Sequence, residues 1–358
     1  MLRCLAAVLP LAVGLCAQTT TTPTEPTWQR TRAVWFGNDA TPTVVAEVGF
    51  GWEAVPHGDD AEQAFAGAKD GDRLPLGTAA WATFETFTDC EFGSVKVRGG
   101  QYYAALERTP AGWSLALLDT AKVRTAQLLP TTPRKVPAVA TIPLAHADGD
   151  GTALAAEWQL RDDGARLVLR CGRHTLTADA TVQGCKGAFP LAQPMARGAV
   201  RLAFADPKDG AQPFVLLDHG QPRWNDALTD AGKQLAPGKR WRLGQDWPTT
   251  LETNVPLTIA GKKLAAGSWH LTLAKAKGDG WNLVLSEATA DFAARIDGFA
   301  PDRVTPVLEV PLRRGKADAT SDTLAIGFVA DGKQQRLVIT YGDQQLHAPV
   351  AAAARGKG

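Results

Sequence analysis

One arrangement of residues occurs twice in this chain, and the two copies lie at an almost constant spacing. The spacing is 167 at first, grows to 168 between Trp113 and Trp281, and reaches 170 between Leu167 and Leu337. Loops absorb inserted residues at little cost, so insertions confined to turn-like segments indicate one shared fold. We therefore predict two tandem homologous domains, residues 29–183 and 198–351, joined by a linker at 184–197. The first matched set is Gly71, Arg73, Leu76, Gly77, Glu85 and Gly100 with Gly238, Arg240, Leu243, Gly244, Glu252 and Gly267.

Apolar and polar residues alternate within each copy, as they do along 268–273 and 281–286. A period of two is typical of half-buried antiparallel strands. Turn signals such as Asp331-Gly332 separate the alternating runs. Short helices are expected only within 59–68, 119–128 and 286–296. The predicted fold is all-β with a few short helices, built as two tandem homologous antiparallel β-sandwich domains.

The N-terminus has the pattern of a targeting segment. Arg3 precedes an apolar run that is too short to cross a bilayer, and Ala17 offers a small residue for cleavage. Lipoprotein signals place a small residue before the modified cysteine, and because Leu15 precedes Cys16 we favour cleavage near Ala17 over a lipid anchor. We expect a signal peptide at 1–17, a polar linker at 18–28 and a flexible tail at 352–358. The protein is expected to be secreted or periplasmic, with no transmembrane segment.

The charge balance bears on nucleic-acid binding, and the cysteine count bears on possible disulfides. The 38 Lys and Arg residues nearly balance the 37 Asp and Glu residues, which argues against a nucleic-acid-binding protein. Cys90, Cys171 and Cys185 remain after the signal peptide is removed, and an odd number leaves a thiol unpaired. An oxidising compartment allows a Cys171–Cys185 disulfide. Three buried free thiols are the alternative.

The second copy carries a longer motif. The sequence LAPGKRWRLG at 235–244 is followed by Thr249-Thr250, by IAGKKL at 259–264 and by Trp281. This pattern resembles the exported bacterial family called domain of unknown function 2911. The first copy resembles it less closely, because residues 59–70 intervene between the motif's opening at 55–58 and Arg73. The resemblance implies a mostly β, exported domain and implies no reaction.

Charged residues at matched positions, and charged and aromatic residues in the loops before the following strand, are the candidate ligand-binding residues. A carboxylate and a guanidinium could line a cleft in each copy and grip a polar ligand, and Trp81 and Trp247 could stack on a sugar ring. Strand-to-strand ion pairs, and indoles that plug the end of a sandwich, are the structural alternatives. The candidates are Arg240, Asp246, Trp247 and Glu252 in the second copy and Arg73, Trp81 and Glu85 in the first.

Catalytic and metal motifs are absent from the sequence. The six histidines are scattered without metal-ligand spacing, although three of them could still converge in the fold. No serine lies in a nucleophile elbow, and a Ser–His–Asp set from distant segments stays open. We predict no metal and no cofactor. The favoured function is a non-enzymatic envelope or extracellular module that binds a ligand or partner such as a glycan or an envelope component. A hydrolase acting on an extracellular polymer and a structural spacer are the alternatives.

Overall fold

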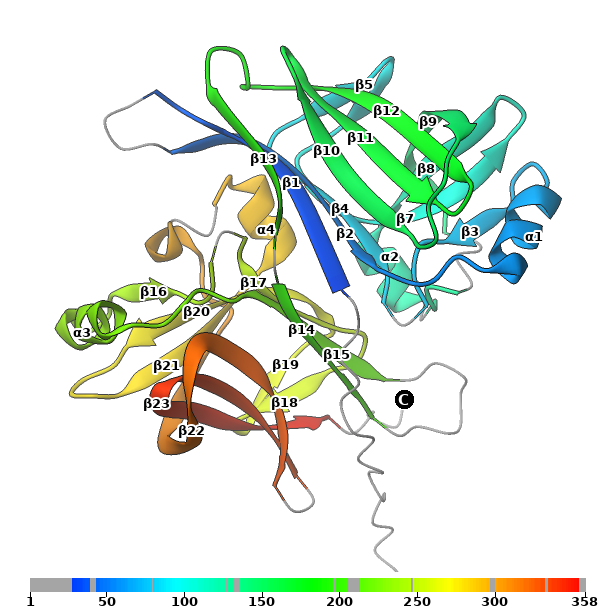
Figure 1. The fold of residues 1–358 in the computed structure, drawn as a ribbon. Helices are drawn as coiled ribbons and strands as arrows, with labels where there is room; N and C mark the ends of the chain where they lie inside the picture. The colour runs from blue at the N-terminus through cyan, green and yellow to red at the C-terminus, as the bar shows by residue number, and fades with distance from the viewer. Residues whose placement is uncertain are drawn as a thin grey trace, which may run out of the picture.

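The computed structural model describes residues 28–38, 43–78, 80–126, 128–131, 136–195, 197–204, 213–245, 247–296, 300–331 and 334–353. The predicted signal peptide, residues 18–27 of the predicted linker and residues 354–358 of the predicted tail lie outside these ranges. Strands dominate the described chain and its helices are short (Figure 1), which confirms the predicted all-β class. None of the described helices is long and apolar enough to span a bilayer.

The first half of the molecule comprises residues 28–195. Its helices are α1 (Asp59–Gly67) and α2 (Thr120–Thr125). Its strands are β1 (Trp28–Phe36), β2 (Val44–Glu53), β3 (Arg73–Pro75), β4 (Ala82–Thr86), β5 (Cys90–Phe92), β6 (Val95–Val97), β7 (Gly100–Thr109), β8 (Gly112–Asp119), β9 (Ala138–Asp148), β10 (Ala155–Arg161), β11 (Gly164–Cys171), β12 (His174–Val182) and β13 (Phe189–Met195).

The second half comprises residues 197–353. Its helices are α3 (Asp226–Gln234), α4 (Ala288–Ala293) and the 3-10 turn η1 (Pro301–Arg303). Its strands are β14 (Arg197–Ala203), β15 (Phe214–Gly220), β16 (Arg240–Arg242), β17 (Thr249–Thr253), β18 (Leu257–Ile259), β19 (Lys262–Leu264), β20 (Gly267–Lys275), β21 (Trp281–Glu287), β22 (Leu308–Asp331) and β23 (Gln334–Ala352).

Each half is a β-sandwich because one long strand leaves one layer and enters the other. In the first half, residues 138–144 of β9 pair with β8, whereas residues 145–148 pair with β12. In the second half, residues 308–312 of β22 pair with β21, and the strand then pairs with β23 from residue 313 onward. The sheets are antiparallel throughout the described pairings, so the predicted antiparallel β-sandwich class is confirmed.

Most corresponding strands of the two halves pair in the same register, although β1–β2 and β14–β15 differ by two residues. The spacings between matched pairs are those found in the sequence, and this agreement supports the predicted duplication. The matched pairs are Val48–Thr86 with Val215–Thr253 at a spacing of 167, and Glu157–Val168 with Gly327–Val338 at a spacing of 170.

Each half has a hydrophobic core of its own. The first core gathers side chains from residues 33–185, among them Trp35, Phe50 and Leu167. The second gathers side chains from residues 202–350, among them Leu271 and Ile339. The two halves therefore fold around two interiors and not around one shared interior.

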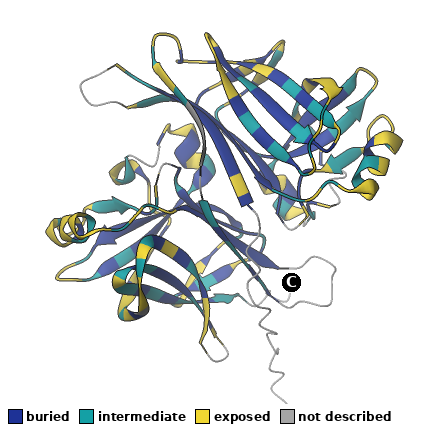
Figure 2. Cartoon of the chain, viewed as in Figure 1, coloured by how far each residue is buried: buried dark blue, intermediate teal, exposed yellow. Residues whose placement is uncertain are grey.

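The halves meet along a junction that buries the outer faces of several strands. All nine residues of β20 are buried, as are all five of β17 and all seven of β15. Figure 2 shows this continuous burial along the strands at the junction. The prediction that strand 268–273 is half-exposed is therefore wrong. One face of β20 contacts its own core, and α4 and the junction cover the other.

Two further differences from the sequence expectations concern single elements. Helix α3 was not predicted, yet it occupies in the second half the place that α1 occupies in the first. Residues 59–70 are therefore not an insertion peculiar to the first copy. The predicted linker 184–197 contains β13, which pairs with β1 along seven residue pairs and leads into β14 (Figure 1).

Candidate functional site

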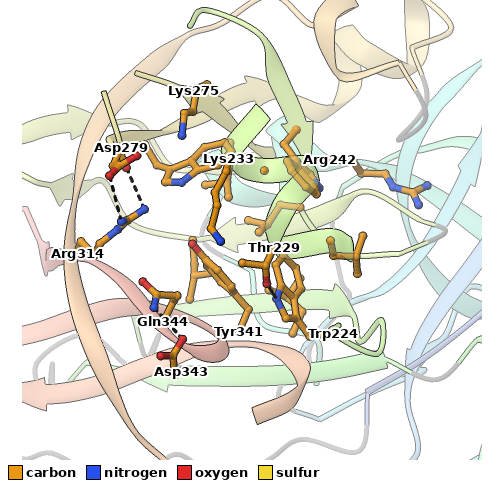
Figure 3. Close-up of a pocket in the computed structure, with 18 residues that line it drawn as sticks. Trp224, Thr229, Lys233, Arg242, Lys275, Asp279, Arg314, Tyr341, Asp343 and Gln344 are labelled. Carbon is orange, nitrogen blue, oxygen red and sulfur yellow. Dashed lines mark hydrogen bonds and ion pairs between the residues drawn. The ribbon is translucent and has the colours of Figure 1, made fainter. Parts of the chain in front are cut away.

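A cavity of about 380 Å³ opens at one end of the second sandwich, between α3 and the strands β16, β20, β21, β22 and β23 (Figure 3). Four aromatic residues dominate its walls, and we call it the aromatic pocket. The ring centroids of Trp224 and Tyr341 are 4.4 Å apart, those of Trp224 and Trp241 are 6.4 Å apart, and those of Trp241 and Trp281 are 6.0 Å apart. Large apolar surface with a few polar groups is typical of a small-molecule site.

Local structure holds the aromatic walls in place. Asn225 caps α3, since its side-chain oxygen accepts a hydrogen bond from the Leu228 amide. The indole of Trp224 donates to the Thr229 hydroxyl at 2.9 Å, which orients the ring beside the helix. Trp241 belongs to β16, whose pairing with β20 places its indole across from α3. Gly232 lies on that helix face, and a Cβ atom there would come within 2.8 Å of the Trp241 ring.

The pocket carries more basic than acidic side chains. Lys233, Arg242, Lys275 and Arg314 line it together with Asp279 and Asp343. Lys275 lies in β20 directly opposite Trp281, and its ammonium is 4.9 Å from the centre of that ring. Arg314 donates to the Asp279 carbonyl oxygen at 3.1 Å.

The matching end of the first sandwich is filled by a side chain. Phe65 of α1 takes the place that Gly232 has in α3, and it is 6% exposed. Its ring centroid lies 4.0 Å from that of Trp113 and 3.8 Å from that of His174. The two sandwiches therefore share a frame but present different ends, one open and one closed.

Three of the scattered histidines converge beside Phe65. A nitrogen of His146 lies 3.0 Å from one of His174, whose other nitrogen lies 3.1 Å from Glu62. His57 lies 3.3 Å from the same carboxylate. The pKa of Glu62 is lowered, first by a hydrogen bond from the Arg173 amide and then by the histidines. Within the described ranges no three His, Cys, Asp or Glu side chains are arranged to hold a metal ion.

The matched glutamates chosen from the sequence lie at the junction. Glu85 accepts hydrogen bonds from Arg30 at 2.6 Å and from Gln101 at 2.9 Å. Glu252 accepts a hydrogen bond from Tyr103 of the other half, and burial raises the pKa of the Glu252 carboxyl. Both carboxylates are buried, so neither faces an open cleft.

The two candidate tryptophans are also buried. Trp81 stacks on Tyr103 with 5.3 Å between centroids, and its indole donates to the Leu128 carbonyl. Trp247 is 1% exposed and lies beneath the guanidinium of Arg30, 5.1 Å away. Trp81 therefore packs within the first half and Trp247 packs against the first half across the junction, and Asp246 lies outside the described residues.

The matched arginines bind neighbouring strands and loops. Arg73 forms an ion pair with Glu107 at 2.9 Å and donates to the Val136 carbonyl. Arg240 donates to the carbonyl oxygens of Pro301 and Val304. Sequence reasoning chose Arg240 and missed its neighbour Trp241, although the pocket wall is made by the latter.

The described cysteines are free thiols. Cys90, Cys171 and Cys185 are all buried, and no disulfide joins Cys171 to Cys185. Burial raises the pKa of Cys90 and of Cys171 to about 12, which keeps both thiols protonated and unreactive near neutral pH. The structure therefore has three buried free thiols, which was the alternative to the disulfide.

Distant segments do bring a serine, a histidine and an aspartate together. Ser286 and His270 both donate to the carboxylate of Asp291, the latter at 2.9 Å. A hydrolytic triad instead needs the serine hydroxyl hydrogen-bonded to the histidine, with the aspartate behind it. All three side chains are at most 3% exposed, so the set stabilises the start of α4 and does not face the aromatic pocket.

Comparison with known proteins gives one match. No curated protein and no solved structure matches the chain. The model of the family described as "Protein of unknown function (DUF2911)" matches residues 215–350. This range contains the residues that line the aromatic pocket, from Trp224 to Gln344. Residues 215–350 of the chain therefore form a DUF2911 domain.

Proposed function

We propose that the protein is an exported, non-enzymatic binding module whose second half takes a sugar ring of a glycan in the aromatic pocket. The observation that carries the proposal is the contrast between the two sandwich ends. The second presents four aromatic rings around an open cavity, whereas Phe65 fills the same place in the first. The part of the proposal that concerns export rests on the signal-peptide pattern of residues 1–17 in the sequence.

The size and surface of the pocket suit a small ring-shaped ligand. Its volume of about 380 Å³ falls within the range of about 300–1,000 Å³ that is usual for small-molecule sites. The flat faces of Trp224, Trp241 and Trp281 offer the apolar area on which a ring stacks. A structural spacer would need no such cavity.

The pocket's acids favour binding over hydrolysis. Asp343 accepts a hydrogen bond from Gln344 at 2.7 Å, and Asp279 faces Arg314. Glycoside hydrolysis needs one carboxyl group kept protonated as the acid. Glu252, a carboxyl group whose pKa is raised by burial, lies at the junction against Tyr103 and not in the aromatic pocket.

The test is to close the pocket with the residue that closes its counterpart. We expect Gly232→Phe to abolish binding to a panel of mono- and oligosaccharides measured by calorimetry on the mature chain, because the new ring displaces Trp241 and fills the cavity. Gly67→Phe is the matched control, since a Cβ atom on Gly67 of α1 would meet no neighbouring atom within 4 Å. Binding that survives in Gly232→Phe, or a wild-type chain that binds no sugar, would contradict the proposal.

A further inference from the structure

We propose that the ligand of the aromatic pocket is an anionic sugar, whose carboxylate or phosphate group pairs with the ammonium of Lys275. This inference rests on the proposed function and specifies the chemistry of its ligand. It begins from a buried basic residue that the fold itself leaves without an acidic partner.

Lys275 is 5% exposed, which is unusual for a lysine. Among the described residues no carboxylate lies within ion-pair distance of its ammonium, and the contact recorded for that group is with the ring of Trp281. A cation held over an aromatic ring gains roughly 0.5–2 kcal/mol, whereas removal of an unpaired charge from water costs several kcal/mol. An anion delivered by a ligand would supply the missing partner.

The backbone fixes where this ammonium lies. The Lys275 amide donates to the Lys239 carbonyl, and the Lys275 carbonyl accepts from the Gly238 amide. Lys275 also faces Trp281 directly across the β20–β21 pair, and directly opposed side chains in antiparallel strands are in contact. The side chain therefore borders the cavity from a rigid strand (Figure 3).

The other charges of the pocket act in the same direction. Lys233 and Arg314 are exposed at its rim, paired with Asp230 at 3.1 Å and with Asp279 at 3.9 Å. Aromatic walls can also attract a cationic ligand such as a quaternary ammonium. Here the ammonium of Lys275 already lies over the Trp281 ring, so it would repel a cationic ligand from that ring. The charges favour an anion.

The first half provides a matched control. Arg108 corresponds to Lys275, and its guanidinium lies 5.6 Å from the ring of Trp113, the counterpart of Trp281. Phe65 packs against that same ring and closes this end of the sandwich. Arg108 therefore has the same position over a tryptophan as Lys275, but at a sandwich end where no pocket is open.

The experiment compares paired ligands on the mature chain by calorimetry, with glucose and glucuronate as one pair and glucose 6-phosphate and choline as further probes. We expect glucuronate or glucose 6-phosphate to bind at least about tenfold more tightly than glucose, because a charge-assisted hydrogen bond is stronger than a neutral one. Choline should not bind. Lys275→Gln should remove the preference for the anion, Lys275→Arg should retain it, and Arg108→Gln should leave it unchanged.

The outcomes distinguish failure of the anionic-ligand proposal from failure of the sugar-binding proposal. Equal binding of glucose and glucuronate, or an anion preference that persists in Lys275→Gln, would overturn the anionic ligand and leave sugar binding in place. Binding of choline in preference to the anions would overturn it as well. Failure of every sugar to bind the wild-type chain would overturn both proposals. Circular dichroism and thermal melting of Lys275→Gln and Lys275→Arg verify that each variant is folded.

Discussion

At position 232 a hydrogen atom stands where the other half of the molecule has a phenyl ring. The presence of Phe65 or Gly232 on matched helices decides whether a sandwich end is filled or hollow. Lys275 and Arg108 show the same principle for charge, because each lies over a tryptophan but only Lys275 borders an open cavity. The two sandwich ends therefore differ through a few side chains placed on matching elements.

His219 makes a residue-scale prediction about pH. Burial lowers the pKa of its imidazole to about 4, with Asp218 opposing and Arg197 assisting the change. The neutral ring accepts a hydrogen bond from the Ile326 amide at 3.2 Å, which a protonated ring cannot do. The unfolded chain binds this proton near pH 6.5 and the folded chain only near pH 4, so stability falls as the pH falls through that window.

We expect this histidine to contribute a loss of up to about 3 kcal/mol in the free energy of unfolding between about pH 7 and pH 4. Urea denaturation at half-unit pH steps measures the loss. In His219→Gln the curve should flatten across this window relative to the wild-type curve. Parallel curves for the two proteins would show that His219 is not responsible.

At the scale of elements, α1 and α3 are the pair in which the two halves differ most. Helix α1 begins without a side-chain cap and contributes the buried Phe65, whereas α3 begins with the Asn225 cap and contributes no large apolar side chain to a core. Helix α1 is therefore held against its sandwich by the packing of Phe65. Helix α3 is held by its cap and by the hydrogen bond from Trp224 to Thr229.

Removal of the ring from α1 tests that attachment. Phe65→Ala should lower the free energy of unfolding by about 3 kcal/mol, as is usual when a buried phenyl group leaves a cavity. Chemical denaturation followed by tryptophan fluorescence measures the change, since Trp113 contacts the ring. Phe189→Ala is the control, because Phe189 is 63% exposed in β13 and should change stability little. Equal effects of the two substitutions would refute this role for Phe65.

Elements with strong periodicity could be predicted from the sequence, and α3 could not. Helices expected within 59–68, 119–128 and 286–296 are observed at residues 59–67, 120–125 and 288–293. The stretch DALTDAGKQ of α3 has Leu228 as its one large apolar residue, because its inner face borders a cavity and not a core. For the same reason the pocket was missed, since alternation indicates that Trp241 and Trp281 lie on strand faces but not which sandwich end is hollow.

At the scale of the whole molecule, a buried network of charges joins the two sandwiches. Arg30 of the first half lies 2.6 Å from Glu85 and 2.6 Å from Asp218 of the second half. Arg197 pairs with the same aspartate at 2.5 Å. Burial alone would raise the pKa of Asp218, but these arginines hold it below its ordinary value. The sequence left open whether Glu85 and Glu252 line clefts or form ion pairs, because partners so distant along the chain cannot be recognised from local pattern.

Removal of the central arginine should weaken the molecule as a whole. We expect Arg30→Met to lower the free energy of unfolding by about 3–5 kcal/mol, since it leaves the Glu85 carboxylate buried without a cation. Differential scanning calorimetry measures this and shows whether the halves then melt separately. Arg166→Met, which breaks an exposed pair with Asp179, should have little effect. A wild-type melting curve for Arg30→Met would show that the network does not stabilise the junction.

Strand β13 has a consequence for how the first sandwich is completed. Because it covers the outer side of β1 through seven residue pairs, that sheet lacks its last strand until the chain has been made as far as residue 195. A polypeptide that stopped near residue 183 would present the backbone amides and carbonyls of β1 to solvent. Such unpaired margins are where strands of other chains attach, so the short stretch before the second sandwich shields the first from self-association.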